Sequence, residues 1–187
     1  MFEFVSMETW LNFKSKTFIT TEKNYPTTLP SRSTIHSAGY DFRSPFNLEI
    51  YDVDVFNRTT YLLPTGIKWN PKGSVWTNLA VSSNNNNDSI SNQKINTTNV
   101  VLELYPRSSF GFKYGFILLN TVGIIDADYY NNTQNEGHII LGFKTLSPMT
   151  IKRGDKICQG IIKPYLIMDN EEIPTDIRSG GTGSTGS

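Results

Sequence analysis

Short stretches of alternating apolar and polar residues recur along the chain, separated by residues that favour turns. Alternation with a period of two residues is typical of a β-strand with one buried face. Short apolar runs bounded by turn residues predict further strands. The predicted strands are 48–55 (LEIYDVDV), 100–105 (VVLELY), 139–143 and 157–162.

Helical periodicity, by contrast, is scarce in this sequence. A short helix is predicted around residues 7–13, but no segment keeps the 3.6-residue period over a dozen residues. Residues 61–69 (YLLPTGIKW) are apolar but contain Pro64 and Gly66, which favours two short strands or one strand with a bulge. The pattern therefore predicts an all-β fold, either a barrel or a sandwich.

Residues 70–99 interrupt this pattern with a polar, Asn-rich stretch. The part that reads SSNNNNDSISNQKINTTN has almost no large apolar side chains, so it cannot bury enough surface to offset its ordering entropy. We predict a flexible insert between two strands. Binding of a protein partner through this insert is a further hypothesis.

Composition and charge argue against a nucleic-acid-binding protein and against a membrane protein. The chain has 187 residues, enough for one domain with a core, and its 17 basic residues balance 17 acidic ones. This balance argues against stable binding to nucleic acid or to an anionic membrane surface. Cys158 is the single cysteine, and no signal peptide or apolar run of about 18 residues is visible. We therefore expect a cytoplasmic protein without membrane association.

The stretch 120–129 (NTVGIIDADY) is the first candidate for chemistry. We expect Gly123 to permit a tight reversal that Asn120 opens, because glycine tolerates backbone angles that a Cβ forbids. Residues 124–125 then predict a strand, with Asp126 and Tyr129 at its exit. A hairpin with an acidic end, without a further role, explains these residues equally well.

Two other segments have the composition of a phosphate site. Arg107, Ser108 and Ser109 follow a predicted strand and offer a guanidinium fork with hydroxyl donors, although an exposed turn accounts for them too. The tail 178–187 (RSGGTGSTGS) can wrap a polyphosphate because its glycines leave backbone amides accessible, but it also has the composition of a linker. Cys158 is expected to be an inert buried thiol.

Taken together in chain order, these segments resemble the trimeric dUTPase family. Five motifs of that family can be found in the sequence. They are 38–41 (AGYD), 106–109 (PRSS), 120–129, 153–159 (RGDKICQ) and 178–186 (RSGGTGSTG). The resemblance covers residues 30–187 apart from the Asn-rich insert. Five motifs in the right order, with strands between them, make the functional interpretation of each segment the stronger one.

The resemblance implies an all-β, jelly-roll-like subunit, a distorted β-barrel, that forms a homotrimer with active sites at the subunit junctions. It implies one domain at 1–177 and an arm at 178–187 that closes over the active site. The implied reaction is hydrolysis of dUTP to dUMP and pyrophosphate. Water attacks the α-phosphorus, and Mg²⁺ is bound to the triphosphate.

Site residues follow from the resemblance, motif by motif. The hairpin with Asn120 and Gly123 would bind the uracil edge, and Tyr129 would lie against the deoxyribose. Asp126 would hold and deprotonate the attacking water, and Asp41 would contact the water shell of the magnesium ion. The phosphate-binding residues would be Arg107, Ser108, Ser109, Gln159, Arg178, Ser184 and Thr185.

Three departures from the family pattern leave alternatives open. Thr182 stands where the family carries a phenylalanine over the uracil ring, which predicts lower affinity or turnover, since base–aromatic stacking contributes about 1–3 kcal/mol. Ser109 replaces a common glycine, and 130–138 is longer than usual, with Glu136 and Gly137 as candidates for the family's residues there. A dUTPase-fold regulator with weak turnover is one alternative, and a dCTP deaminase relative is another.

Overall fold

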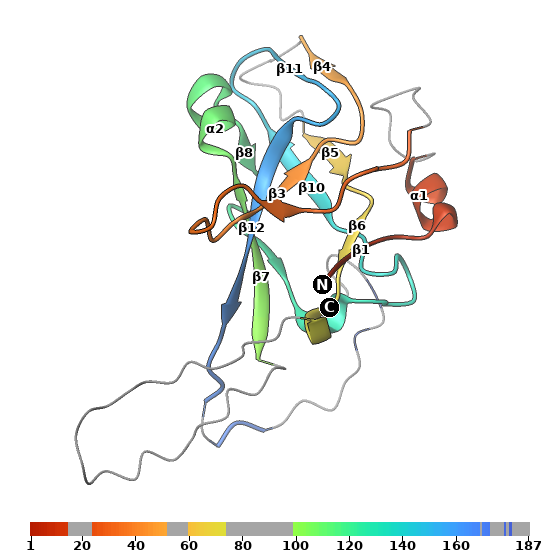
Figure 1. Ribbon diagram of the computed structural model, residues 1–187, viewed down its shortest axis with the longest axis vertical. Helices are drawn as coiled ribbons and strands as arrows, with labels where there is room; N and C mark the ends of the chain where they lie inside the picture. Colours follow the sequence, from red (N-terminus) through yellow and green to blue (C-terminus); the bar gives the residue numbers. More distant parts are fainter. Residues whose placement is uncertain are drawn as a thin grey trace, which may run out of the picture.

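The computed structural model describes residues 1–14, 24–51, 60–73, 99–168, 170–172, 178 and 180, and these form a mainly β structure (Figure 1). In chain order, the elements are β1 Phe2–Phe4, α1 Met7–Lys14, β2 Ser31–Arg32, β3 Tyr40–Arg43, β4 Leu48–Ile50, β5 Tyr61–Pro64, β6 Ile67–Trp69, the 3-10 turn η1 Pro71–Gly73, β7 Val100–Pro106, α2 Ser108–Tyr114, β8 Ile117–Leu118, β9 Gly123–Ile125, the 3-10 turn η2 Ala127–Tyr129, β10 Ile140–Lys144, β11 Met149–Ile151 and β12 Lys156–Pro164.

The strands pair in antiparallel fashion, and β12 is central to the largest sheet. That sheet has the order β2-β3-β12-β7-β9, a second sheet has the order β5-β10-β8, and β1–β6 and β4–β11 form two pairs. Near the middle of β12, a Cβ on Gly160 would lie only 2.8 Å from Leu102 and 2.9 Å from Phe42. Glycine at this position therefore lets the side chains of both neighbouring strands close over β12.

Alternation along the strands builds the core as the sequence predicts. In β7, Val100, Leu102 and Leu104 are buried, whereas the residues between them are partly exposed. Cys158 is also fully buried, and burial raises the pKa of its thiol, which fits the expected inert role. Among the described residues, no helix has the length and apolar composition needed to span a membrane.

Several predicted elements are confirmed, and some are shorter or were missed. The helix at 7–13 is α1, and 61–69 forms two strands around Gly66, whose φ is 72°. Strand 48–55 is described only as β4, Leu48–Ile50, because residues 52–59 lie outside the described part of the chain. Most of the Asn-rich insert, 74–98, also lies outside it. The sequence analysis missed α2, which is only one to two turns long and ends at Gly115 with a φ of 62°.

The N-terminal segment is joined to the rest of the fold by a buried apolar face and by one carboxylate. Val5 and Trp10 are buried, and α1 lies on the side of the molecule where β1 and β6 pair (Figure 1). The Glu136 carboxylate accepts hydrogen bonds from the Ser6 amide at 3.0 Å and the Thr9 hydroxyl at 2.6 Å. Lys68 Nζ lies 3.3 Å from the same carboxylate. Glu136 thus binds the first turn of α1, where partial positive charge favours an anion.

Glu136 should contribute to stability in a pH-dependent way. Burial alone would raise its pKa, but the hydrogen bonds from Ser6 and Thr9 and the nearby Lys68 lower the pKa to about 2. Because the pKa is lower in the folded state, its contribution is present above the unfolded value of about 4.5 and is lost as the pH falls toward 2. We expect Glu136→Gln to lower the free energy of unfolding by about 1–3 kcal/mol at neutral pH, and by less below pH 4.

Chemical denaturation at fixed protein concentration measures this difference. Glu172→Gln, at an exposed position, is the control and should change stability by less than about 0.5 kcal/mol. Equal stability of Glu136→Gln and the unsubstituted protein at neutral pH would contradict the role of Glu136.

Candidate active site

The turn at 119–122 joins two different sheets, which corrects the predicted hairpin. Leu118 on β8 pairs with Phe143 of β10, whereas Gly123 on β9 pairs with Leu104 of β7. The positive φ in the turn belongs to Thr121, at 64°, and not to Gly123. The two strands therefore separate after the turn and leave a space between the sheets.

Gly123 has a packing role in place of the predicted conformational one. A Cβ at this position would lie 3.0 Å from the Cβ of Leu104, closer than most Cβ contacts in proteins. Glycine therefore lets β9 approach the Leu104 side chain of β7. This close approach fixes the floor of the space between the two sheets.

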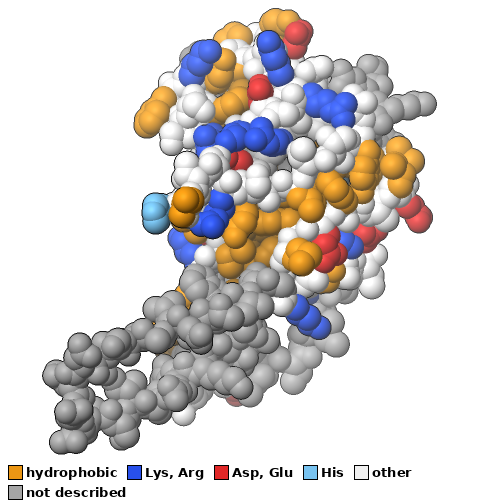
Figure 2. Space-filling model, viewed as in Figure 1, with side chains coloured by type: hydrophobic (Ala, Val, Ile, Leu, Met, Phe, Trp, Pro, Cys, Tyr) orange, Lys and Arg blue, Asp and Glu red, His pale blue; other side chains and the backbone are white. Residues whose placement is uncertain are grey.

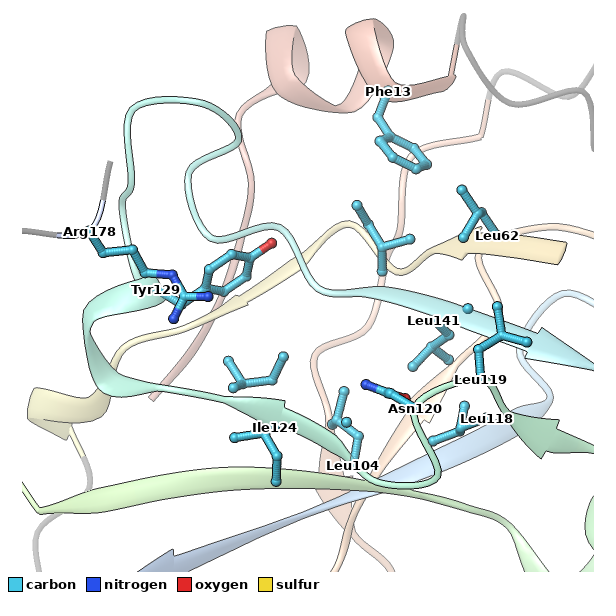
Figure 3. A pocket seen from close by; sticks show the side chains of 14 residues that line it. Phe13, Leu62, Leu104, Leu118, Leu119, Asn120, Ile124, Tyr129, Leu141 and Arg178 are labelled. Atoms are coloured by element: carbon cyan, nitrogen blue, oxygen red, sulfur yellow. The ribbon is translucent and has the colours of Figure 1, made fainter. Parts of the chain in front are cut away.

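The space between the two sheets contains a cavity of about 370 Å³ (Figure 3). This volume is within the range of small-molecule sites. Its walls are mostly apolar, with polar groups contributed by Asn120 and Arg178. The residues that line it are Phe13, Leu62, Leu104, Leu118, Leu119, Asn120, Gly123, Ile124, Ile125, Tyr129, Ile140, Leu141, Gly142 and Arg178. Three residues predicted from sequence to bind the nucleoside, Asn120, Gly123 and Tyr129, thus line one cavity.

Tyr129 is a rigid wall of this cavity. Its hydroxyl donates a hydrogen bond to the His138 carbonyl at 3.0 Å and accepts one from Asn135 Nδ2 at 2.8 Å. Burial raises the pKa of its phenol, so the hydroxyl remains protonated near neutral pH. The Arg178 guanidinium lies 5.1 Å from the ring centroid, in the range of a cation–π contact.

Asp126 lies beside the cavity: it follows Ile125 in the chain, and its carboxylate contacts Arg178, and both of these residues line the cavity. It precedes η2 in an extended conformation, and its side chain is 53% exposed. Arg178 Nη1 lies 2.8 Å from Asp126 Oδ2 and 3.4 Å from Asp128 Oδ1. The predicted base and the predicted phosphate ligand of the arm are therefore directly paired in this structure.

A second hollow, rich in cations, lies at the start of α2. Figure 2 shows several Lys and Arg side chains on the upper half of the face in view, with apolar side chains between and below them. The charged residues of the hollow are Arg43, Arg107, Lys113, Asp155 and Lys156. Four cations against one lining carboxylate make this hollow suited to an anion.

Asp41 is buried beneath the second hollow and orients two of its cations. The carboxylate is 2% exposed, and its oxygens lie 2.6 Å from Arg107 Nη1 and 2.8 Å from Lys156 Nζ. Ser33 donates a third contact at 2.5 Å. Burial alone would raise the pKa of Asp41, but Lys156, Ser33 and Arg107 outweigh it, and the pKa is lowered. Asp41 is therefore a fixed anion that holds Arg107 and Lys156 in place.

The other predicted phosphate ligands lie close to this hollow or outside the described residues. Ser109 lines it, and Ser108 is exposed at the start of α2. Gln159 on β12 stands opposite Asp41 in the strand register. A Cβ on Gly39 would lie 2.5 Å from Gln159 Oε1, so the glycine of the AGYD motif makes room for this side chain. Ser184, Thr185 and Thr182 lie outside the described residues.

The predicted residues thus fall into two groups. Asn120, Gly123, Tyr129 and Arg178 line the cavity, with Asp126 beside them, and the remaining described ones gather around the cationic hollow. The lining residues described for the two spaces have no member in common.

Several residues that line these spaces were not predicted from the sequence, among them Arg43, Lys113 and Phe13. Arg43 lies two residues after Asp41 on β3, and Lys113 lies four residues after Ser109 on α2. Both spacings put the cation on the same face as a predicted residue, which is a signal the sequence offers. Phe13 lines the cavity from α1, and its sequence position carries no such signal.

The residues around the hollow fit a magnesium ion that is already bound to a polyphosphate. Both Asp41 oxygens already contact cations, and the described residues contain no group of three or more His, Cys, Asp or Glu side chains that could hold a metal. Magnesium commonly binds proteins through one or two carboxylates together with substrate phosphates. The residues therefore fit an ion that arrives on a polyphosphate, and not one held in a cage of protein ligands.

Comparison with known proteins assigns the chain to a family. A model of the dUTPase family matches residues 94–186. The chain is 33% identical over 171 residues to the deoxyuridine 5′-triphosphate nucleotidohydrolase of Lactococcus lactis, and the match covers 90% of this chain and 94% of that protein. The chain belongs to the dUTPase family.

Two further comparisons agree with this membership. The deoxyuridine 5′-triphosphate nucleotidohydrolase of Finegoldia magna is 32% identical over 178 residues, with 91% of this chain and 99% of that protein covered. The crystal structure of dUTPase from Streptococcus mutans is similar with a TM-score of 0.56 and 31% identity, covering 81% of this chain and 97% of that one. The expected dUTPase-like all-β fold is thereby confirmed.

The cationic hollow should bind inorganic triphosphate without a nucleoside. We expect Lys113→Ala and Lys156→Ala each to weaken this binding roughly tenfold at low salt, since each removes a charge-assisted contact. The loss should shrink as ionic strength rises. Isothermal titration calorimetry measures the affinities, with Lys144→Ala, an exposed lysine outside the hollow, as the control. Unchanged triphosphate affinity in both variants would exclude the hollow as an anion site.

Proposed function

We propose that this chain hydrolyses dUTP to dUMP and pyrophosphate. The observation that carries the proposal is an apolar cavity lined by Arg178, whose guanidinium is paired with the solvent-exposed carboxylate of Asp126. Its relatives in Lactococcus lactis and Finegoldia magna are named deoxyuridine 5′-triphosphate nucleotidohydrolases. The size and apolar lining of the cavity suit a nucleoside, and the phosphate chain of that nucleotide would extend toward Asp126 and Arg178.

In this proposal, the turn at 119–122 recognises the base by its edge. Backbone groups and the Asn120 side chain would meet the donors and acceptors of uracil. Cytosine reverses the donor and acceptor sense at its 4-position, and a buried mismatch of that kind is costly. The floor at Gly123 leaves little room for the methyl group of thymine. Tyr129, fixed by its two hydrogen bonds, would exclude a 2′-hydroxyl and so discriminate against UTP.

Asp126 is proposed as the residue that orients and deprotonates the attacking water. A carboxylate is a weak base for water, so positioning and neutralisation of phosphate charge must supply most of the rate. Arg178 pairs with Asp126 at 2.8 Å in this structure. A bound phosphate would compete for Arg178 and leave the carboxylate free to hold water. In that state Arg178, with Ser184 and Thr185 of the arm, would contact the terminal phosphate.

The phosphate chain would be bound by the cationic hollow, with Arg107, Ser108, Ser109 and Gln159 as its ligands. Because the cavity and the hollow have no described lining residue in common, we propose that one active site combines the cavity of one subunit with the hollow of another. This arrangement calls for a symmetric oligomer, and we propose a homotrimer.

Magnesium is proposed as the cofactor, with Asp41 as the carboxylate nearest to its water shell. When bound to the triphosphate, the ion supplies charge neutralisation that favours attack at the α-phosphorus. Asp41 itself holds Arg107 and Lys156 against the phosphates. We further propose that the reaction takes place in the cytoplasm, where the free thiol of Cys158 is the usual state of cysteine.

Two alternative functions are distinguishable from this one. A dCTP deaminase needs a glutamate at the base, and none of the described residues that line the cavity is a glutamate. A regulator with weak turnover would bind dUTP without releasing pyrophosphate. Thr182 and the Asn-rich insert are the features that suggest such a regulator. They lie almost entirely outside the described residues. Hydrolysis by the unsubstituted protein decides between this alternative and the proposed enzyme.

Removal of the Asp126 carboxylate should abolish turnover but not nucleotide binding. We expect Asp126→Asn to lower kcat for dUTP by about 100- to 10,000-fold, the range attributed to a general base. Pyrophosphate release measures kcat, and calorimetry with a non-hydrolysable dUTP analogue measures affinity. Asp128→Asn, which also removes a carboxylate near Arg178, is the control and should retain most of the activity. Normal hydrolysis by Asp126→Asn would show that another group is the base.

Mixed oligomers test whether each site is shared between subunits. Asp126→Asn and Arg107→Ala should each be inactive alone, because each removes one half of every site. After co-refolding in equal amounts, roughly a quarter of the sites should combine an intact Asp126 with an intact Arg107 from different chains. Pyrophosphate release should therefore return. A mixture that stays as inactive as its parents, although mixed oligomers form, would place both residues of a site in one chain.

A further inference from the structure

Among the residues that line the cavity, Phe13 lies farthest in the sequence from the turn at 119–122. It lies near the C-terminal end of α1 and lines the cavity together with Asn120 and Tyr129. In Figure 3 its ring points from α1 toward the space between Tyr129 and Leu62, across from the turn that carries Asn120. A helix outside the five family motifs therefore contributes a wall to the cavity.

The position of Phe13 is fixed by the anchoring of its helix. Trp10, one turn earlier on α1, is fully buried, and the Glu136 carboxylate binds Ser6 and Thr9 at the start of the helix. An aromatic ring at the end of a helix held in this way loses little further freedom when a ligand binds. Such preorganisation increases the affinity that the ring can contribute.

His138 supports both aromatic walls of the cavity. The rings of Phe13 and His138 meet in a T-shaped contact with centroids 5.3 Å apart, and the His138 carbonyl accepts the hydrogen bond of Tyr129. His138 itself is fully buried, and its Nε2 accepts a hydrogen bond from the Gly66 amide at 2.9 Å. One buried residue thus sets the positions of Phe13 and Tyr129 relative to each other.

The aromatic members of the described cavity lining are Phe13 and Tyr129. The guanidinium of Arg178 lies over the Tyr129 ring, so this ring already has a cation against one face. A nucleobase whose edge meets the turn still presents its two apolar faces to the cavity walls. Phe13 lines the cavity and brings an aromatic ring to its wall, and base–aromatic stacking is favourable for every base.

We propose that Phe13 is a further substrate-binding residue, which covers the apolar surface of the nucleoside, and that α1 is therefore part of the binding site. The nucleoside as ligand rests on the function proposed above. The turn at Asn120 reads the edge of the base, Tyr129 bounds the sugar, and Phe13 closes the side of the cavity that faces α1.

The test measures nucleotide binding separately from turnover. Calorimetry with dUMP should show about tenfold weaker binding by Phe13→Ala than by the unsubstituted protein, a loss within the range known for base stacking. Phe13→Leu, which keeps apolar volume but lacks the ring, should show about threefold weaker binding. Inorganic triphosphate, which has no base, should bind all three proteins equally. With dUTP as substrate, Phe13→Ala should lower kcat/KM mainly by raising KM, which is the pattern expected for the loss of a binding contact.

Leu11→Ala is the matched control on the same helix. Leu11 is 49% exposed and does not line the cavity, so this variant should bind dUMP normally. Unchanged dUMP affinity in Phe13→Ala, or an equal loss of dUMP and triphosphate affinity, would overturn the proposal. If Phe13→Ala does not fold, Phe13→Leu decides by the same criteria. A protein that shows the Phe13 dependence for dUMP but never hydrolyses dUTP would refute the proposed function and retain this one.

Discussion

The separation of β8 and β9 after a single turn is the constraint on which the candidate site depends. Had the two strands paired with each other as a hairpin, their side chains and backbone bonds would fill the space between them. Instead β8 pairs with β10 and β9 pairs with β7, so the turn at Asn120 spans two sheets. The cavity forms because the two sheets diverge there, and the close approach of Gly123 to Leu104 keeps it narrow.

Packing around His138 connects this cavity to the N-terminal segment. The residue receives the Tyr129 hydroxyl on its carbonyl, the Gly66 amide on its ring and the Phe13 ring at its side. Burial lowers the pKa of its imidazole to about 4, so the ring is neutral near pH 7 and Nε2 can accept a hydrogen bond. A stable neutral imidazole suits a structural support better than a proton-transfer group.

The cavity and the cationic hollow differ in their balance of charge. In the cavity, Arg178 is paired with Asp126 and Asp128, so its charge is balanced until a competing anion binds. In the hollow, the buried Asp41 and the lining Asp155 balance only part of the charge of the four surrounding lysines and arginines. The excess positive charge would favour phosphate and the apolar cavity would favour a nucleoside, and the proposed substrate contains both chemical parts.

The sequence by itself determined the features that depend on near neighbours. The alternation of β7, the strand β12 after its turn, the short helix α1 and the break at Gly66 were all predicted from the sequence, because periodicity and turn chemistry are local. The resemblance to the dUTPase family also implied that Asn120 and Tyr129 belong to one site, and both line the cavity. Only the tertiary structure decided that Gly123 serves packing and not the reversal, that Arg43 and Lys113 join Arg107, and that Phe13 reaches the cavity. These relations depend on which strands pair and which helix covers them. Such contacts join residues more than a hundred positions apart, as Phe13 and His138 are, and no local pattern encodes them.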